Sequence, residues 1–242
     1  MTAFRPPRPW SVSRRAWLAG EVGVLLALAG GGALRPAHAL GEAEAASGLR
    51  AALERGADTA IGLLGREGGF LDNPKVRIPL PDSLARAAQL MRSLGQGDRV
   101  DALVTAMNRA AEQAVPQARA LLSQAVRSMS VGDALQVLRG GDTAATDFFR
   151  GRTEAPMAER FLPIVRAETE KVSLARKYDA IAGRARRLGL IDDRQASLPT
   201  YVTGRALDAL YRTIAEEEQR IRQDPVGTGS RILQSVFGAL KG

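Results

Sequence analysis

The sequence predicts an all-α fold, a single compact domain of about eight to ten mostly short helices. Two observations support this prediction. The chain of 242 residues is rich in Ala, Leu, Arg and Glu, which are all strong helix formers. Apolar residues recur at helical spacing along most of it, whereas no segment shows the sustained alternation of a half-buried strand. One stretch departs from this pattern and allows an extended loop over residues 76–80 or a short extended hairpin near residues 70–80.

The first helix of the domain is expected over residues 43–64, because apolar residues recur there every three or four positions and Gly65 follows. Residues 66–81 come next as the one long non-helical stretch. Pro79 and Pro81 exclude a helix there, because proline lacks the N–H that a helix needs and disfavours the helical conformation of the residue before it.

Capping residues and glycine or proline breaks predict the boundaries of the helices that follow. The expected N-terminal residues are, in chain order, Asp82 or Ser83, Asp98, Ser130 in a capping box closed by Asp133, and Asp142. Pro116 is expected to kink or restart the second of these helices, and Gly140-Gly141 to end the third. A further helix is expected to hold Pro156 in its first turn and to break at Pro163.

Three more helices are expected in the C-terminal part of the chain. Apolar spacing indicates one over residues 172–188. Ser197 and Pro199 are typical of a helix start, and they open a long helix that continues to about Gln223. A last helix is expected around residues 232–237.

Residues 1–39 are predicted to be a cleaved signal peptide of the twin-arginine type. The motif Ser13-Arg14-Arg15-Ala16-Trp17-Leu18 precedes an apolar run of 13 residues, 22–34, and the segment closes with Ala37-His38-Ala39, a cleavage pattern. That run is too short to cross about 30 Å of hydrocarbon. The mature domain, residues 40–242, is therefore expected in the periplasm and without a transmembrane segment.

Composition excludes several classes of site in the mature chain. Cysteine is absent and the single histidine, His38, lies in the leader, which excludes disulfides, Cys or His metal sites, thiol catalysis and His-based triads. We expect no cofactor and no metal. Five of the 34 basic and one of the 26 acidic residues belong to the leader, so the mature chain has a net charge of only +4. Acids and bases alternate along it, which disfavours nucleic acid as a partner.

Several short blocks occur in a fixed order along the mature chain. They are Asn108-Arg109-Ala110-Ala111-Glu112-x-Ala114, Asp133-Ala134, Gly140, Ala144-Ala145-Thr146-x-x-Phe149, Ala206-Leu207-Asp208-x-Leu210, Glu216-Glu217-Glu218, Ile221-Arg222-x-Asp224-Pro225 and Leu233-x-x-Val236-Phe237. The series resembles the bacterial domain-of-unknown-function family 4197 over about residues 48–238. The resemblance implies an all-helical protein that usually carries an export signal. It implies no catalytic residue, because no activity is established for that family.

A polar cluster on one predicted helix is the candidate site. Asn108, Arg109 and Glu112 share one helix face among small residues, so a neighbouring helix can approach closely and bury them. Buried polar groups need partners, and the candidate partners are Asp133, Thr146 and Arg222. The cluster is interpreted either as a packing network or as the polar floor of a ligand pocket, with Glu112 as a catalytic carboxylate the remaining alternative.

The acidic run Glu216-Glu217-Glu218 has basic residues one helical turn further on. Glu216 with Arg220 and Glu218 with Arg222 are spaced for i, i+4 ion pairs, which indicates a solvated, salt-bridged helix face.

These features predict an exported, non-enzymatic helical protein that binds a small or amphipathic ligand or an envelope protein. The alternative is a hydrolase or lyase that uses carboxylate, Lys, Ser or Tyr chemistry without a metal. It requires two titratable side chains, such as Glu112 and Asp133, to converge in one cleft. No catalytic residue is assigned.

Overall fold

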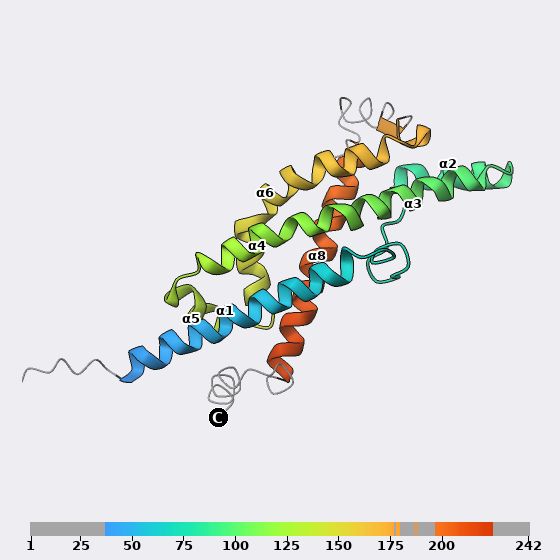
Figure 1. The fold of residues 1–242 in the computed structure, drawn as a ribbon. Helices are drawn as coiled ribbons and strands as arrows, with labels where there is room; N and C mark the ends of the chain where they lie inside the picture. Colours follow the sequence, from blue (N-terminus) through green and yellow to red (C-terminus); the bar gives the residue numbers. More distant parts are fainter. Residues whose placement is uncertain (1–36, 177, 180–186, 188–196, 225–242) are drawn as a thin grey trace, which may run out of the picture. The chain divides into compact units, whose positions relative to one another are not determined.

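The computed structural model describes residues 37–176, 178–179, 187 and 197–224. Within these residues the chain forms seven complete α-helices and one 3₁₀ helix, has further helical residues between α6 and α8, and contains no strand, so the all-α prediction is confirmed (Figure 1). The elements are α1 (Ala37–Leu64), α2 (Asp82–Ser93), α3 (Gly97–Ala114), η1 (Val115–Gln117), α4 (Ala118–Arg127), α5 (Val131–Arg139), α6 (Ala144–Thr169) and α8 (Leu198–Gln223).

Two of these helices, α1 and α6, are longer than the sequence indicates, whereas α8 is the long helix that was expected. α1 begins at Ala37 rather than at residue 43, and α6 has 26 residues where separate short helices were expected, one of them with Pro156 in its first turn. The predicted break at Pro163 does not occur, because α6 continues through both Pro156 and Pro163. A proline inside a helix costs about 3 kcal/mol. Burial of one face offsets this cost, since α6 places a large or branched residue in the core at every fourth position: Phe149, Thr153, Met157, Phe161 and Val165.

The connection between α1 and α2 is irregular rather than a hairpin. It consists of turns up to residue 76 and then an extended stretch, residues 77–81, that pairs with no strand among the described residues. Gly68 has a φ of 77°, a conformation that glycine adopts without strain, and it lets the chain turn sharply after α1. Of the two predicted possibilities, the extended loop is confirmed and the hairpin is wrong. The backbone groups of the loop bond to side chains of α3 instead, as described below.

The predicted helix starts are confirmed at two caps. Ser130 caps α5 in a complete capping box with Asp133, and Ser197 caps α8, which ends at Gln223 as expected. The other three expected caps are wrong: the residues before α2, α3 and α6 are Pro81, Gln96 and Thr143, and none of them makes a side-chain cap hydrogen bond.

The core lies between α8 and the helices around it. α8 packs against α6 and α1, α3 packs against α6, and α1 runs along α4 and α5 (Figure 1). The largest side chains without exposed surface include Tyr211 of α8 and Phe149 and Phe161 of α6. Fully buried alanines on α1 and α3 allow close approach of neighbouring helices. Within the described part of the chain, no helix combines the length and the apolar character that crossing a membrane requires.

Three expectations fall wholly or partly outside the described residues. The helix expected over residues 172–188 is described only at residues 173–176, 178–179 and 187, which are helical. The helix expected around residues 232–237 lies outside them, as does the leader up to residue 36.

Candidate functional site

Asn108 ties the extended stretch after α1 to helix α3. Its side-chain oxygen accepts the backbone N–H of Ile78 at 2.8 Å, and its amide nitrogen donates to the carbonyl of Ile78 at 3.0 Å and to that of Val104 at 2.8 Å. Asn108 and Ile78 are both fully buried. The side chain thus bonds to both polar backbone groups of Ile78, as a neighbouring strand would, and this explains why no hairpin forms there.

Glu112 holds the turn that precedes this stretch. One carboxylate oxygen accepts the backbone N–H groups of Phe70 and Leu71, each at 3.0 Å. The other accepts a hydrogen bond of 2.8 Å from Arg109, whose second nitrogen donates to Glu67 at 2.9 Å. Glu112 is only 4% exposed, so its charge is buried but fully paired.

These contacts also determine the ionisation of Glu112. Desolvation by burial acts to raise the pKa of its carboxyl group, but the N–H groups of Leu71 and Phe70 and the guanidinium of Arg109 together outweigh it. The pKa of Glu112 therefore lies below its usual value of 4.5. A general acid needs a raised pKa, so this carboxylate is suited to binding N–H groups and not to proton donation near neutral pH.

A second cluster joins Thr146 and Arg222 through Glu218. The carboxylate of Glu218 accepts the backbone N–H groups of Ala145 and Thr146 and the hydroxyl of Thr146, all at 2.9 Å. It also accepts two hydrogen bonds from Arg222, at 2.8 and 3.1 Å, and Arg222 donates to the carbonyl of Val137 in the last turn of α5. Glu218 thus caps α6 from α8, in place of the missing local cap.

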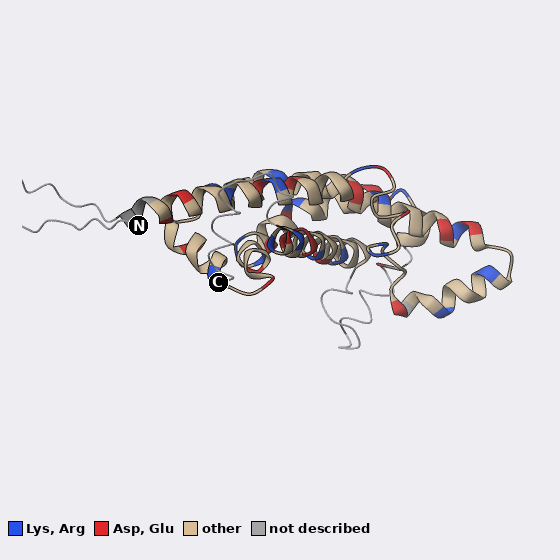
Figure 2. Ribbon diagram, turned by 90° about the horizontal axis from the view of Figure 1, so that it is seen from below, with Lys and Arg blue, Asp and Glu red and all other residues tan. Residues whose placement is uncertain are grey.

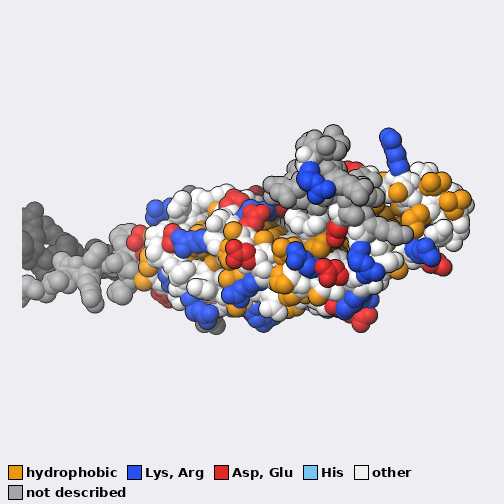
Figure 3. Space-filling model, turned by 90° about the horizontal axis from the view of Figure 1, so that it is seen from above, with side chains coloured by type: hydrophobic (Ala, Val, Ile, Leu, Met, Phe, Trp, Pro, Cys, Tyr) orange, Lys and Arg blue, Asp and Glu red, His pale blue; other side chains and the backbone are white. Residues whose placement is uncertain are grey.

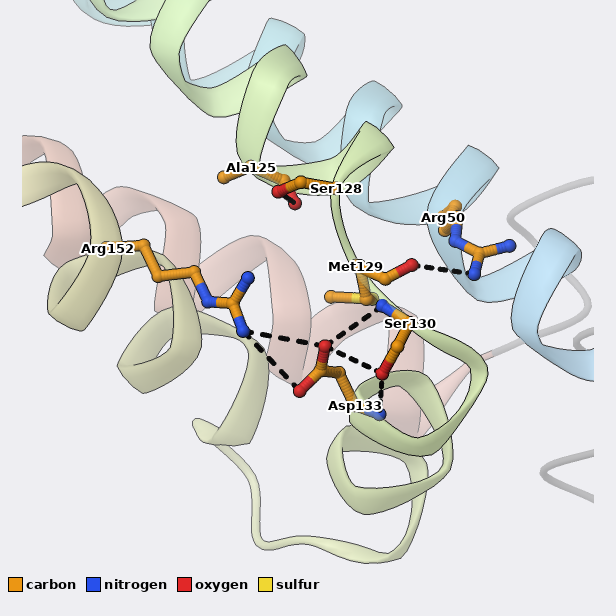
Figure 4. A network of polar contacts seen from close by, with 7 residues as sticks. All are labelled: Arg50, Ala125, Ser128, Met129, Ser130, Asp133 and Arg152. Carbon is orange, nitrogen blue, oxygen red and sulfur yellow. Dashed lines mark hydrogen bonds and ion pairs between the residues drawn. The ribbon is translucent and has the colours of Figure 1, made fainter.

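Asp133 belongs to a third cluster, at the start of α5 (Figure 4). Its carboxylate accepts the backbone N–H of Ser130 at 2.9 Å and lies 3.5 Å from a guanidinium nitrogen of Arg152. Hydrogen bonds from the backbone and the hydroxyl of Ser130, with the charge of Arg152, lower the pKa of Asp133 although desolvation opposes them. Arg50 of α1 donates to the carbonyl of Met129 at 2.8 Å and holds the turn before α5, while Arg152 of α6 contacts Asp133 in the first turn of that helix.

The six candidate residues thus form three clusters and not one. Arg109 and Glu112 pair with each other, and Asn108, on the same helix, holds the adjoining stretch through Ile78. The expected partners of Asn108 and Glu112 are wrong, because Thr146 and Arg222 bond to Glu218 and Asp133 bonds to Ser130 and Arg152.

Glu218 is the residue that the sequence pattern placed on the wrong surface. Its i, i+4 pair with Arg222 forms, but the side chains are only 5% and 12% exposed, so the pair does not lie on a solvated face. The helical spacing indicates that Glu218 is buried, because position 218 follows Leu210 and Ile214 at intervals of four residues and lies on the same buried face. The predicted neighbouring pair does not form: Glu216 lies near Lys75, and Arg220 pairs with Glu217.

A pocket of about 690 Å³ opens between α6 and α8, at residues that the sequence did not single out. It is more than twice as large as the pocket of about 270 Å³ between α1 and α8. The lining residues are Asp147, Arg150, Gly151, Glu154, Ala155 and Ala158 of α6, and Thr200, Thr203, Gly204, Leu207 and Asp208 of α8. None of the six candidate residues is among them.

One polar group at this pocket has no partner. Thr203 lines the pocket, and its buried hydroxyl makes no hydrogen bond in the structure. A buried polar group left unpaired costs about 1–3 kcal/mol. Among the described residues, no group of acidic side chains gathers closely enough to hold a metal ion.

The surface of α2 exposes two large apolar side chains. Leu90, near the end of α2, and Leu94, which directly follows it, are 61% and 65% exposed, more than any other large apolar side chain of the described residues. Figure 3 shows hydrophobic side chains gathered at the end of the molecule formed by α2 and the start of α3. Acidic and basic residues, by contrast, are interspersed along the helices, and neither sign collects on one of them (Figure 2).

Comparison with known proteins identifies one family. The model of the family described as "Protein of unknown function (DUF4197)" matches residues 39–238, nearly all of the predicted mature chain. No curated protein and no solved structure matches the sequence. The match covers well over half of the chain and agrees with the resemblance of the sequence blocks, so the protein belongs to the DUF4197 family.

Proposed function

We propose that the mature chain is a non-enzymatic periplasmic protein that binds a small ligand in the pocket between α6 and α8. The pocket itself carries the proposal, because ligand sites are concave and mostly apolar, with a few polar groups that fix orientation. Leu207 and two alanines supply the apolar wall, and Arg150 and Thr203 supply polar groups. The leader motif supports export, as does a family match that begins at residue 39, where the expected leader ends.

Two glycines provide much of the space in the pocket. Gly151 of α6 and Gly204 of α8 lie inside helices, where glycine costs about 0.5–1 kcal/mol relative to alanine. A Cβ atom at either position would have no heavy atom within 4 Å, so neither glycine is needed for close helix packing. Both line the pocket, from opposite helices. We infer that the space they leave is used by a ligand.

A larger side chain in place of a pocket glycine should abolish ligand binding without lowering the stability of the protein. In Gly204→Leu the side chain enters the pocket, so we expect loss of the bound ligand, while the free energy of unfolding stays equal or rises by up to about 1 kcal/mol because leucine favours a helix. The measurement is native against denaturing mass spectrometry of protein exported through its own leader, with thermal unfolding in parallel. The denaturing mass should correspond to a chain that begins at Leu40.

The matched control is Gly62→Leu. Gly62 lies in α1, and a Cβ atom there would likewise meet no heavy atom within 4 Å. Gly62 does not line the pocket, so this variant should keep the retained mass. Equal ligand retention in the two variants would contradict a site between α6 and α8, and a wild-type protein without any retained mass would contradict the ligand-binding function.

The hydrolase or lyase alternative finds less support. Glu112 and Asp133 belong to separate clusters, and the pKa of each is lowered. Burial raises the pKa of Tyr211, which therefore stays protonated and cannot serve as a base near neutral pH. Burial also raises the pKa of Asp179, but its carboxylate accepts the N–H of Leu198 at 2.6 Å and so serves the start of α8.

Binding of an envelope protein is a second candidate function. The exposed side chains of Leu90 and Leu94 favour it, because exposed apolar patches mark interaction surfaces.

The double variant Leu90→Ser/Leu94→Ser tests this surface. We expect it to lose crosslinks to the partner in the periplasm, while its free energy of unfolding changes by less than about 0.5 kcal/mol because both side chains are exposed. Site-specific photo-crosslinking at position 87 of α2, read by mass spectrometry, measures this. Leu63→Ser is the control, since Leu63 is 40% exposed on α1. Unchanged adducts in the double variant would exclude this surface.

A further inference from the structure

We infer that the pocket between α6 and α8 selects a small organic cation with an apolar body, an inference that rests on the proposed ligand-binding function. Three carboxylates line the pocket, those of Asp147, Glu154 and Asp208, and Arg150 is the one basic side chain among the lining residues. The lining therefore carries a surplus of negative charge. A ligand with a positive charge complements this surplus, whereas an anion is repelled by it.

Arg150 is already engaged and does not offer an anion site. Its Nη1 lies 3.7 Å from a carboxylate oxygen of Glu154 and 3.6 Å from one of Asp208. Its guanidinium carbon lies 4.5 Å from the ring centroid of Tyr211, so the group is also held against an aromatic face. An anionic ligand would have to displace two carboxylates from this guanidinium.

Asp147 supplies a charge that forms no ion pair with an arginine or lysine among the described residues. Its carboxylate accepts one hydrogen bond of 3.3 Å, from the hydroxyl of Thr143. Asp147 and Arg150 are one turn apart on α6, and both line the pocket. The carboxylate of Asp147 therefore faces the same space as Arg150 and its two acidic partners, but has no basic partner of its own among the described residues. We therefore place the positive group of the ligand near Asp147.

The rest of the lining favours an apolar body of modest size. Leu207 is buried, and Ala155, Ala158 and the two glycines leave smooth helix surface around it. A primary amine on a compact hydrocarbon matches both the surplus of negative charge and the apolar wall of the lining.

The experiment compares three probes with the same phenylbutyl body: 4-phenylbutylammonium, 4-phenylbutanol and 5-phenylpentanoate. Each is titrated into the mature chain at low salt, and the amide signals of Gly151 and Gly204 are followed by NMR. We expect the ammonium probe to bind about tenfold more tightly than the alcohol, and the carboxylate to bind least, because only the first gains a Coulomb interaction with the lining. The preference should shrink as salt is raised, since the carboxylates are partly exposed.

A charge variant with a matched control tests the assignment of the group. Asp147→Asn should remove most of the preference for the ammonium probe, while Glu159→Gln, on the same helix but outside the pocket, should preserve it. If the alcohol binds as tightly as the ammonium probe, the cation inference is overturned and the ligand-binding function stands. If no probe shifts Gly151 or Gly204 and the exported chain retains no mass, both are overturned.

Discussion

Replacing Glu218 by alanine is expected to lower the free energy of unfolding by about 3–5 kcal/mol, the cost of breaking a buried ion pair by removal of one partner. The substitution leaves the N–H groups of Ala145 and Thr146 without their acceptor at the start of α6. It also leaves Arg222, only 12% exposed, without its carboxylate. Urea unfolding followed by circular dichroism measures the change.

Two further variants test the cause of this loss. Glu218→Gln keeps an oxygen that can accept the N–H groups of α6 but loses the charge, so its effect should lie between those of wild type and Glu218→Ala. Glu216→Ala serves as the control, because Glu216 is 45% exposed and only 3.7 Å from exposed Lys75, a contact expected to contribute below about 1 kcal/mol. A loss below about 1 kcal/mol in Glu218→Ala would show that α6 does not depend on the cap from α8.

The Glu218 cluster indicates why the sequence predicted the helices better than the contacts between them. Ser130 and Ser197 were predicted correctly as caps, because a capping serine acts on N–H groups only two or three residues away. The start of α6 has no such local cap. Its acceptor comes from a residue 73 positions further along the chain, and no local pattern specifies that pairing.

The same distinction between local and tertiary effects explains the errors in helix length and in the hairpin. Pro163 is a helix breaker by intrinsic propensity, but buried residues of α6 such as Phe161 and Val165 stabilise the helix on both sides of it. Residues 77–81 are extended, as their prolines indicate, yet Asn108 satisfies Ile78 in place of a second strand. In both cases contacts with another helix, and not the local sequence, determine the conformation of the segment.

The candidate site was predictable in part. The helical spacing of Asn108 and Glu112 among alanines indicated two buried polar groups on one face, and both are buried in the structure. Their partners are mainly backbone groups of the connection after α1, and a backbone group has no signature in the sequence. The pocket was missed for a related reason, since Gly151 and Gly204 acquire a role only where α6 meets α8.

Glu112→Ala is expected to lower the free energy of unfolding by about 2–4 kcal/mol near pH 7. It removes the acceptor of the N–H groups of Phe70 and Leu71 and the buried partner of Arg109, and each group left unpaired carries a penalty. Glu67→Gln is the matched control, because Glu67 contacts the same arginine from an 87% exposed position and should contribute below about 1 kcal/mol. Equal losses of unfolding free energy in the two variants would show that the buried contacts of Glu112 stabilise the protein no more than the exposed contact of Glu67.

The pH dependence of this effect follows from the lowered pKa of Glu112. A carboxyl group whose folded-state pKa lies below its unfolded value stabilises the protein fully above the unfolded value, here 4.5, and loses that contribution as the pH falls through the folded pKa. Glu112→Gln cannot ionise, so the difference in unfolding free energy between wild type and this variant should be constant from pH 7 to about 5 and should shrink below pH 4.5. Urea titrations at pH 7, 5 and 3.5 measure it. A difference that stayed constant down to pH 3.5 would mean that the N–H groups of the turn bind the protonated carboxyl as well as the carboxylate, and that the ion pair with Arg109 does not stabilise the connection after α1.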